Sequence, residues 1–434
     1  MKPTQARRWV VVFAIALAMI CYTDRVIIAQ AETNIRKELT LTQIQWTWVL
    51  TIFSLAYTFF EIPGGWMGDK WGAKRMLIRV TVLWSVFTAA TGAVWNFASL
   101  MTCRLLFGIG EAGCFPNLTK TFTAWLPQDE RVRAQGLMWM AARWGGAVTP
   151  FLVAWMLGFI PWRVVFVLFG LLGIIWAFFF VRWYRDDPHS HPAVNEAELA
   201  LLPNIRDHVS HGEGVPWGEI LSRRSIWLLW LQYFLLSVPW WFYIQRLPTY
   251  LKEVRGFTLE KNTLEGAALA GLPLFLGGIG CWAGGHFAPW LAARVGGTRT
   301  ARRLVGIFGL LAAGGLIFLS IHLENPYLAM VAMGFAGLAN DLTIAGSWAS
   351  CMDIGGRFAG SVSGGMNMGG AGGGAVAALL VGYILHWSGN NWNIALYSFV
   401  GIYLVAAFCW LGIDPVTPID GSRSGARGQP SPAR

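Results

Sequence analysis

Long runs of apolar residues, separated by short polar stretches, make up most of this chain. Each run is about twenty residues long and apolar on all sides, which is the length a helix needs to cross about 30 Å of hydrocarbon. A membrane β-barrel would instead show segments of about ten residues with alternating polarity. The pattern therefore predicts an all-α membrane protein with twelve spans, at residues 9–30, 46–66, 77–97, 100–125, 134–158, 161–183, 226–250, 266–293, 303–322, 327–350, 360–385 and 391–412.

The spans fall into two groups of six, which predicts two six-helix halves at residues 1–183 and 224–412. Residues 184–223 between them are polar and read as a linker. Residues 413–434 are rich in Pro, Gly, Ser and Arg, a composition typical of disorder. Transporters built from two such halves bind their substrate between the halves, near the middle of the bilayer.

Lysine and arginine fall in alternate loops, which is the pattern that orients membrane helices. The opposite loops, such as residues 96–99 and 388–390, carry little or no charge. Both termini and the linker are therefore expected on the cytoplasmic side. The cations on that side are Lys2, Arg7, Arg8, Lys70, Lys74, Arg75, Arg79, Arg131, Arg133, Arg182, Arg185, Arg206, Arg223, Arg224, Arg294, Arg299, Arg302 and Arg303.

Composition supports lipid as the main solvent of the surface. Hydrophobic residues make up 55% of the 434 residues and charged residues only 13%, against about 25% charged residues in a soluble domain. The net charge of +10 follows from the loop cations, so we expect no nucleic-acid partner. The six cysteines form no C-x-x-C pair, and the linker histidines His189 and His191 lack further ligands at metal spacing. We expect no metal, no cofactor and no enzyme activity.

Five ionisable residues stand out within the predicted spans: Asp24, Arg25, Arg104, Glu111 and Arg143. A charge at the bilayer centre costs at least about 2.5–3.5 kcal/mol, so each is a candidate functional group. Arg104 and Glu111 are two helical turns apart and share a face, about 10 Å apart along the axis. Glu111 falls near mid-membrane and is a candidate proton carrier. Arg104 lies nearer the outer end, where it could instead reach the interface.

A permanent cation in a membrane cavity indicates an anionic substrate. The planar guanidinium of Arg25 suits a carboxylate or a phosphate, whereas Asp24 can take up a proton. Alternatively, the four charged residues of the first and fourth spans, Asp24, Arg25, Arg104 and Glu111, could form a structural ion-pair network. Arg143 is a candidate second cation, and Arg246 fits better as an interfacial anchor. Neutral hydrogen bonds to the substrate could come from Tyr22, Tyr57, Tyr243 and Asn367.

The loop after the second span reads Gly68-Asp69-Lys70-Trp71-Gly72-Ala73-Lys74-Arg75. It resembles the signature loop of the major facilitator superfamily, in which the acid can cap and pair across neighbouring helix ends. The resemblance assigns a conformational role to Gly68, Asp69, Gly72, Lys74 and Arg75. A second copy is expected after the eighth span. Glycines and basic residues are present there, around residues 284–303, but the acid is not evident.

Two further motifs resemble the anion:cation symporter family of that superfamily. They are Tyr22-Thr23-Asp24-Arg25 in the first span, and residues 104–117 in the fourth, which contain Arg104, Gly108, Gly110, Glu111 and Pro116. Residues 353–360, with Asn367, are similar to the family's entry to the eleventh span. The resemblance covers nearly the whole chain. Bacterial members take up sugar acids such as galactonate, glucarate and hexuronates with protons, and animal relatives carry sialic acid and glutamate.

The resemblance implies a role for each candidate residue. Arg25 would bind the substrate carboxylate, and Tyr22, Tyr57 and Asn367 would line its pocket. Asp24 and Glu111 would be protonation sites, with Arg104 coupled to Glu111. Some sugar-acid members have a neutral amide where this chain has Arg143, which suggests a second negative charge or a phosphate on the substrate, or else an internal ion pair.

The sequence therefore predicts a proton-coupled symporter that takes up a small organic anion, most simply a sugar acid, by alternating access. It would sit as a multi-pass protein in a bacterial inner or plasma membrane, and a monomer is the default for this architecture. An organophosphate/phosphate antiporter of the same fold, holding phosphate on Arg25 and Arg246, is one alternative. A carrier of aromatic or dicarboxylic acids is another. A non-transporting sensor would need a larger soluble output domain than the linker or tail offers.

Overall fold

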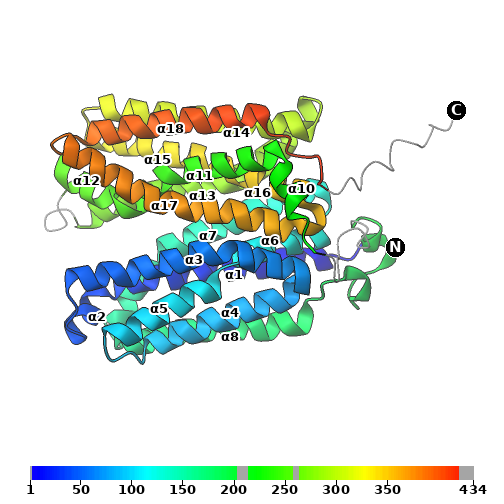
Figure 1. Ribbon diagram of the computed structural model, residues 1–434, viewed down its shortest axis with the longest axis horizontal. Coiled ribbons are helices and arrows are strands. Elements are labelled where there is room, and N and C mark those ends of the chain that lie inside the picture. The colour runs from blue at the N-terminus through cyan, green and yellow to red at the C-terminus, as the bar shows by residue number, and fades with distance from the viewer. Residues whose placement is uncertain (1, 203–213, 258–262, 420–434) are drawn as a thin grey trace.

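In the computed structural model, residues 2–202, 214–257 and 263–419 are described, and their regular elements are all helices. The long helices run side by side in two bundles, one from each half of the chain (Figure 1). The first bundle contains α1 (Ala6–Gln30), α3 (Gln43–Trp71), α4 (Ala73–Thr91), α5 (Phe97–Glu111), α6 (Cys114–Trp125), α7 (Gln128–Leu157) and α8 (Trp162–Trp183). The second contains α11 (Arg224–Gln245), α13 (Thr263–Arg294), α14 (Thr298–His322), α15 (Pro326–Leu342), α16 (Ile344–Gly355), α17 (Ala359–Trp387) and α18 (Trp392–Gly412).

The prediction of twelve spans in two halves is confirmed, but two spans are interrupted and two others end several residues earlier than predicted. The predicted fourth and tenth spans are each two helices in line, α5 with α6 and α15 with α16. The third span ends at Thr91 rather than at residue 97, because Asn96 already caps the start of α5. The seventh span ends at Gln245, and the short helix α12 (Leu247–Val254) follows it with Pro248 in its first turn.

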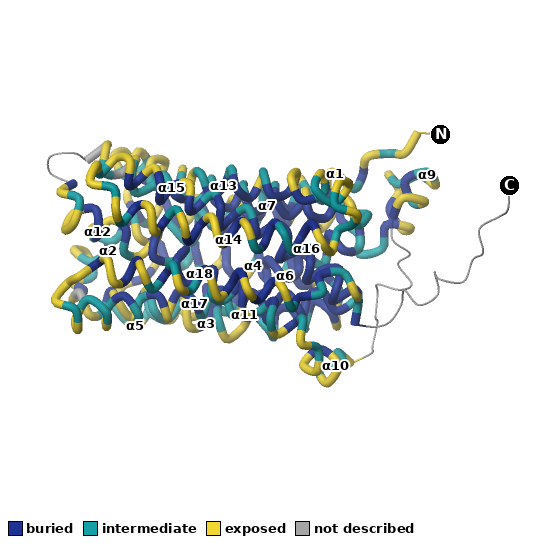
Figure 2. The backbone as a smooth tube through the Cα atoms, turned by 90° about the horizontal axis from the view of Figure 1, so that it is seen from above, coloured by how far each residue is buried: buried dark blue, intermediate teal, exposed yellow. Residues whose placement is uncertain are grey.

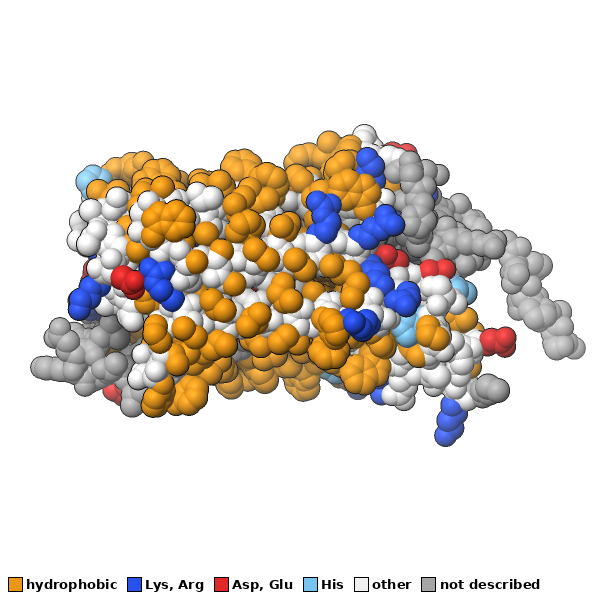
Figure 3. Space-filling view, turned by 90° about the horizontal axis from the view of Figure 1, so that it is seen from below, with side chains coloured by type: hydrophobic (Ala, Val, Ile, Leu, Met, Phe, Trp, Pro, Cys, Tyr) orange, Lys and Arg blue, Asp and Glu red, His pale blue; other side chains and the backbone are white. Residues whose placement is uncertain are grey.

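The outer surface of the bundles is apolar, as a protein solvated by lipid requires. Hydrophobic side chains cover the middle of the face in Figure 3, and Lys and Arg side chains gather toward its ends. Large side chains such as Phe59, Phe159 and Phe408 are 66–76% exposed. Seven described segments are both long and apolar enough to cross a membrane by themselves.

The two halves touch along two pairs of helices, α3 with α17 and α7 with α13, at glycines. A Cβ atom on Gly65 would lie 2.1 Å from the carbonyl oxygen of Gly360, and one on Gly136 would lie 2.5 Å from that of Cys281. Gly65 lies near the end of α3 and Gly136 near the start of α7, which is the side on which α1 begins and α8 leads into the linker. The N-terminus and α9 of the linker stand at that end of the molecule (Figure 2). Farther along α17, a Cβ on Gly372 would meet nothing within 4 Å. The halves are therefore closed against each other at the linker end.

Asp69, in the last turn of α3, holds this closed end together. Its carboxylate accepts hydrogen bonds from Lys120 Nζ at 2.8 Å, from the backbone N–H of Gly360 at 3.1 Å, and from the backbone N–H and hydroxyl of Ser361, both at 2.6 Å. An acid at the first turn of α17 is also favoured by the helix dipole. Asp69 thus joins two elements of the first half to the start of α17 in the second.

The other signature residues shape the loop around Asp69. Gly72 has a φ of +91°, which L side chains rarely adopt. The backbone N–H of Lys74 donates to Asp186 at the start of the linker, at 2.9 Å. Gly68 leaves no room for a side chain, since a Cβ there would lie 1.7 Å from Asn117 Oδ1. The side chain of Arg75 is exposed.

A second cross-half ion-pair group stands at the same end of the molecule. Asp353 of α16 pairs with Arg131 of α7 at 2.8 Å and with Arg302 of α14 at 2.7 Å. The second copy of the signature loop, expected after the eighth span, lacks an evident acid. Asp353 at the end of the tenth span supplies an acid at this end of the second half. It bridges the halves in the way Asp69 does, from the opposite half.

The described part of the linker packs against the first half. Glu198 of the short helix α9 (Glu196–Leu199) accepts hydrogen bonds from the backbone N–H groups of Ala6 and Arg7, from the Arg7 guanidinium and from the Thr4 hydroxyl. In the predicted tail, Ile419 is buried and its N–H donates to Ile354. The rest of the predicted disordered tail, residues 420–434, lies outside the described residues.

Substitution of Asp69 by Ala should weaken the closed end, because Lys120 and the start of α17 lose their shared acceptor. Cys281 reports on this, since it is buried and packs on Gly136 across the interface. We expect a membrane-permeant maleimide to label Cys281 several-fold faster in Asp69→Ala than in the parent, when Cys281 is the only cysteine kept.

The control for this labelling is Asp187→Ala, which removes a half-exposed carboxylate of the linker. It should label at the parental rate. Equal labelling of the parent and Asp69→Ala would show that Asp69 does not hold the halves together.

Substitution of Glu198 by Gln should lower the melting temperature. Burial alone would raise the pKa of Glu198, but the hydrogen bonds from Thr4 and Arg7 outweigh burial and hold the pKa below its ordinary value of 4.5. This stabilisation is present above pH 4.5 and is lost as the pH falls through the lower, folded-state pKa. The difference in melting temperature between the two proteins should therefore shrink on acidification from pH 7 to pH 4. The exposed neighbour Glu196, changed to Gln, is the control.

Candidate functional site

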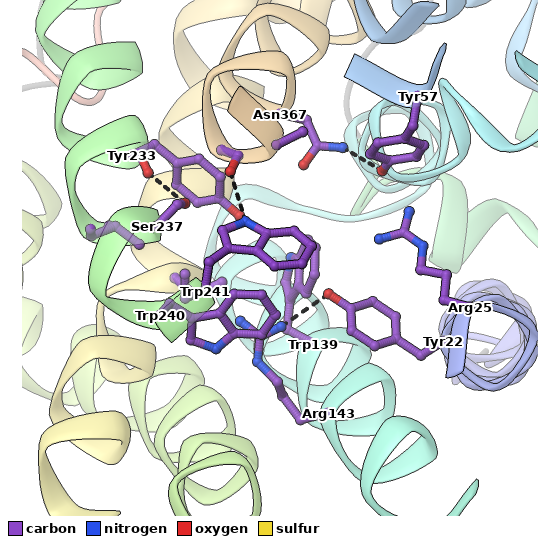
Figure 4. Close-up of a pocket in the computed structure, with 14 residues that line it drawn as sticks. Tyr22, Arg25, Tyr57, Trp139, Arg143, Tyr233, Ser237, Trp240, Trp241 and Asn367 are labelled. Carbon is purple, nitrogen blue, oxygen red and sulfur yellow. Dashed lines mark hydrogen bonds between the residues drawn. The ribbon is translucent and has the colours of Figure 1, made fainter. Parts of the chain in front are cut away.

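A cavity lies between the halves, and residues of both form its wall (Figure 4). The first half contributes side chains from α1, α3 and α7, and the second from α11, α16 and α17. The wall combines two guanidinium groups with aromatic rings and a few neutral polar groups. Its residues are Tyr22, Arg25, Tyr57, Trp139, Arg143, Tyr233, Leu236, Ser237, Trp240, Trp241, Ile344, Asn367, Gly370 and Ala371.

Arg25 of α1 faces this cavity, with an acid directly behind it. Its Nε donates to Glu111 Oε1 at 2.8 Å, and the thiol of Cys21 donates to the same oxygen at 2.7 Å. The Arg25 side chain is 17% exposed, whereas that of Glu111 is 0% exposed. The guanidinium also lies 4.3 Å from the ring centre of Tyr57. The cation is thus presented to the cavity while its counter-charge remains in the protein interior.

The interruption of the fourth span places Glu111 behind Arg25. Glu111 is the last residue of α5, and Gly113, with a φ of +86°, precedes α6. A side chain on Gly113 would collide with Gly64 of α3, since a Cβ would lie 2.7 Å from its Cα. Only glycine fits this combination of backbone angle and close approach.

Arg143 of α7 is the second cation of the wall, and it also has an acidic partner. Its Nε and Nη2 donate to the two carboxylate oxygens of Asp341, at 2.7 and 3.3 Å, and its Nη1 donates to the Tyr22 hydroxyl at 3.0 Å. Its guanidinium carbon lies 4.0 Å from the ring centre of Trp240. Sequence reasoning had allowed for an internal ion pair but missed Asp341. The signal was present as the pair Asn340-Asp341 within an apolar span.

Tyr57 and Asn367 meet across the interface between the halves. The side-chain amide of Asn367 donates to the Tyr57 hydroxyl at 2.9 Å. One turn along α3 from Tyr57, Glu61 is 0% exposed, and neither of its oxygens has a hydrogen-bond partner within 3.5 Å among the described residues. Sequence reasoning missed Glu61, although it too is an acid inside an apolar run.

Asp24 and Arg104 lie away from the cavity wall. Asp24 is 1% exposed, and no described group donates a hydrogen bond to either of its oxygens within 3.5 Å. Arg104 lies over the rings of Phe53 and Phe107, at 4.7 and 4.8 Å from their centres. It forms no ion pair with Glu111 in the part of the chain that the structure describes, because two helical turns separate them. Arg25 is the direct partner of Glu111.

Tyr243 and Arg246 are absent from the described lining of the cavity. Tyr243 lies one helical turn beyond Trp240, and its ring is 3% exposed within the apolar core. Arg246 stands at the junction of α11 and α12 and is only partly buried. Of the six residues predicted to contact substrate, the structure thus brings five to one cavity and leaves Tyr243 outside it.

The arrangement suits the binding of a small anion. Two guanidinium groups can donate several hydrogen bonds to carboxylate-like groups, and Tyr22, Tyr57, Ser237 and Asn367 offer neutral hydrogen bonds to hydroxyls. Groups of three or more His, Cys, Asp or Glu side chains that could hold a metal are not found among residues 2–202, 214–257 and 263–419.

Comparison with known proteins gives the chain its relatives. The family model of the Major Facilitator Superfamily matches residues 13–378. The chain is 33% identical to a probable sulfoacetate transporter of Cupriavidus necator over 410 residues, which is 92% of each chain. It is 30% identical to a probable galactarate/D-glucarate transporter of Escherichia coli, over 94% of each chain. It is 26% identical to an Escherichia coli D-galactonate transporter, over 94% of this chain and 96% of the other.

Solved structures share the fold at much lower identity. The fucose:proton symporter of Escherichia coli superposes with a TM-score of 0.68 at 13% identity, over 94% of this chain and 97% of the other. The human organic anion transporter MFSD10 gives a TM-score of 0.68 at 14% identity, over 93% and 99%. With the family model matched across most of its length, the chain belongs to the Major Facilitator Superfamily and is a multi-pass membrane transporter rather than an enzyme.

Proposed function

We propose that the protein takes up a small organic anion of the sugar-acid class together with protons. The observation that carries this proposal is the Arg25–Glu111 ion pair, in which the cation faces the cavity and the acid is fully buried. Relatives named for sulfoacetate, galactarate, D-glucarate and D-galactonate transport all concern organic acids, which supports the anionic class. The hydroxyl and amide groups of the wall suit a polyhydroxylated acid.

Coupling follows from the competition for Arg25. While Glu111 is ionised, its carboxylate already occupies the guanidinium, and a substrate carboxylate must compete with it. Once Glu111 takes up a proton, Arg25 keeps its charge and becomes available to the substrate. A proton and a carboxylate then enter together, and the loaded site is closer to neutral than an empty site with Arg25 unpaired. Because uncompensated charge is costly to enclose, the loaded carrier closes more readily.

Asp24 is the second protonation site of the proposal. It stands on α1 beside Arg25 and is 1% exposed, and no described group donates a hydrogen bond to its oxygens within 3.5 Å. The positive loops favour a cytoplasmic location for the closed, linker-bearing end. The cavity would then load from outside, and rocking of the halves would deliver the substrate to the cytoplasm.

Phosphate exchange, the alternative that pairs Arg25 with Arg246, finds less support in the geometry. Arg246 is absent from the described cavity wall, and the second cation there is Arg143. A phosphate held by Arg25 and Arg143 would still be compatible with the charges. Counterflow of phosphate without any dependence on a proton gradient would favour that alternative.

Uptake driven by an imposed pH gradient tests the coupling. In proteoliposomes, one pH unit, acid outside, is worth about 1.4 kcal/mol per proton, or about tenfold in accumulation. We expect labelled hexonate or hexarate to accumulate under this gradient in the parent protein. Glu111→Gln, which cannot exchange a proton, should lose the acceleration but still catalyse exchange of labelled for unlabelled substrate.

The exposed-site variant Asp187→Asn should behave as the parent in both assays. Uptake by the parent that ignores the gradient would refute proton coupling. Full gradient acceleration in Glu111→Gln would refute the assignment of the proton to that residue, while leaving coupling itself intact.

A further inference from the structure

Arg143 and Asp341 form a bidentate ion pair between the two halves of the molecule. Arg143 belongs to α7 of the first half, and Asp341 belongs to α15 of the second. Arg143 lines the cavity, but Asp341 is 0% exposed and is absent from the described wall. The pair therefore has the same layout as Arg25 with Glu111, a cation facing the cavity and a buried acid behind it.

The two acids also occupy matching positions in the two halves. Glu111 precedes the first residue of α6, Cys114, by three positions, and Asp341 precedes the first residue of α16, Ile344, by three. Both α6 and α16 are twelve residues long. Each half thus interrupts its fourth span at one acid, and each acid holds one arginine of the cavity wall.

We propose that the cavity takes a dianion, with one acidic group bound at Arg25 and the second at Arg143 in exchange for Asp341. This inference rests on the proposed function and narrows its substrate to compounds with two strongly acidic groups, such as dicarboxylates and sulfocarboxylates. Arg143 is thereby assigned as the residue that distinguishes dianions from monoanions.

One small molecule can reach both cations. The guanidinium carbons of Arg25 and Arg143 lie 5.2 and 5.9 Å from the ring centre of Tyr22, so they are no more than about 11 Å apart. In Figure 4 both side chains point toward the space beside the Tyr22 ring. Trp240, stacked on Arg143, holds the guanidinium at the wall whichever acid it binds.

Asp341 retains one hydrogen bond when Arg143 binds the substrate instead. The side-chain amide of Asn340 donates to Asp341 Oδ1 at 2.9 Å, so the carboxylate keeps one donor after the exchange. Gly277 of α13 allows the carboxylate to pack directly against the helix, since a Cβ there would lie only 2.6 Å from Asp341 Oδ2. A monoanion bound at Arg25 has no second acid to compete with Asp341. A dianion does, and it converts a bond between the halves into a bond to the substrate.

The competing explanation is that Arg143 and Asp341 only hold the halves together. In that case the second acidic group of a substrate would gain nothing at Arg143. D-Glucarate and D-gluconate separate the two explanations, because they share one carbon chain and differ only in having a carboxylate or a hydroxymethyl group at the far end.

The experiment measures binding of both compounds to purified protein in nanodiscs by isothermal titration calorimetry. The parent should bind D-glucarate at least tenfold more tightly than D-gluconate, the usual size of one charge-assisted interaction. The double variant Arg143→Gln/Asp341→Asn removes both charges and leaves neither unpaired. It should bind the two compounds within about threefold of each other.

The single variant Asp341→Asn provides a second measurement. It removes the internal competitor but keeps Arg143, so D-glucarate should bind more tightly than to the parent while D-gluconate changes little. A purely structural pair predicts the opposite pattern, in which both compounds respond equally to either variant.

The outcomes for the proposed function and for this inference differ. If the parent binds both compounds equally and Arg25→Gln weakens both, the dianion assignment is overturned and the anion site stands. If D-glucarate is preferred but the double variant retains that preference, Arg143 is overturned as the discriminating residue. If neither compound binds the parent, the proposed sugar-acid function fails and the inference fails with it.

Discussion

A charge enclosed within a membrane protein needs a group of opposite charge beside it. Arg25 must be present to attract an anion, yet it cannot stand unpaired in the low-dielectric interior while the cavity is empty. Glu111 supplies the counter-charge at 2.8 Å. A proton can remove that counter-charge and a substrate carboxylate can replace it. Proton coupling in this scheme is therefore a consequence of keeping Arg25 compensated at every stage, and it needs no separate device.

Each half places an acid at the break in its fourth span, but the two acids pair with arginines in different ways. The acid is Glu111 in one half and Asp341 in the other. Glu111, however, pairs with an arginine of its own half, whereas Asp341 pairs across the interface. Opening the first pair leaves the contact between the halves unchanged, but opening the second releases one of the bonds between them. In the proposed mechanism, an anion bound at Arg25 leaves the interface unchanged, whereas an anion bound at Arg143 breaks an ion pair between the halves.

Much of this could be predicted from the sequence, and what could not has a common cause. The apolar runs fixed twelve spans, and the rarity of charge within them singled out Arg25 and Glu111. The ion-pair partners of these residues were harder to predict, because the sequence of an all-apolar helix does not indicate which face packs against which neighbouring helix. The family resemblance coupled Arg104 to Glu111, whereas the residue that pairs with Glu111 in the structure is Arg25 of another helix. Asp341 and Glu61 were overlooked within apolar runs, and Tyr243, predicted as a neutral hydrogen-bonding group of the cavity, lies just beyond the residues of α11 that line it. The breaks after Glu111 and Leu342 depend on packing against other helices, such as that of Gly113 on Gly64.

Because the halves are closed at the linker end, a bound substrate can leave there only if it changes the balance between two arrangements of the halves. Asp69 and Asp353 each bridge the halves at that end, and the glycine contacts of α3 with α17 and of α7 with α13 add close packing. A ligand shifts such an equilibrium only by the difference between its affinities for the two states. Contacts confined to Arg25 and the rest of the first half would bind an anion without favouring either state. The groups that matter for movement are those that reach the second half, namely the Tyr57–Asn367 hydrogen bond and the Arg143–Asp341 pair. A substrate that engages both replaces contacts between the halves with contacts to itself, and this exchange allows the closed end to open once the cavity is filled.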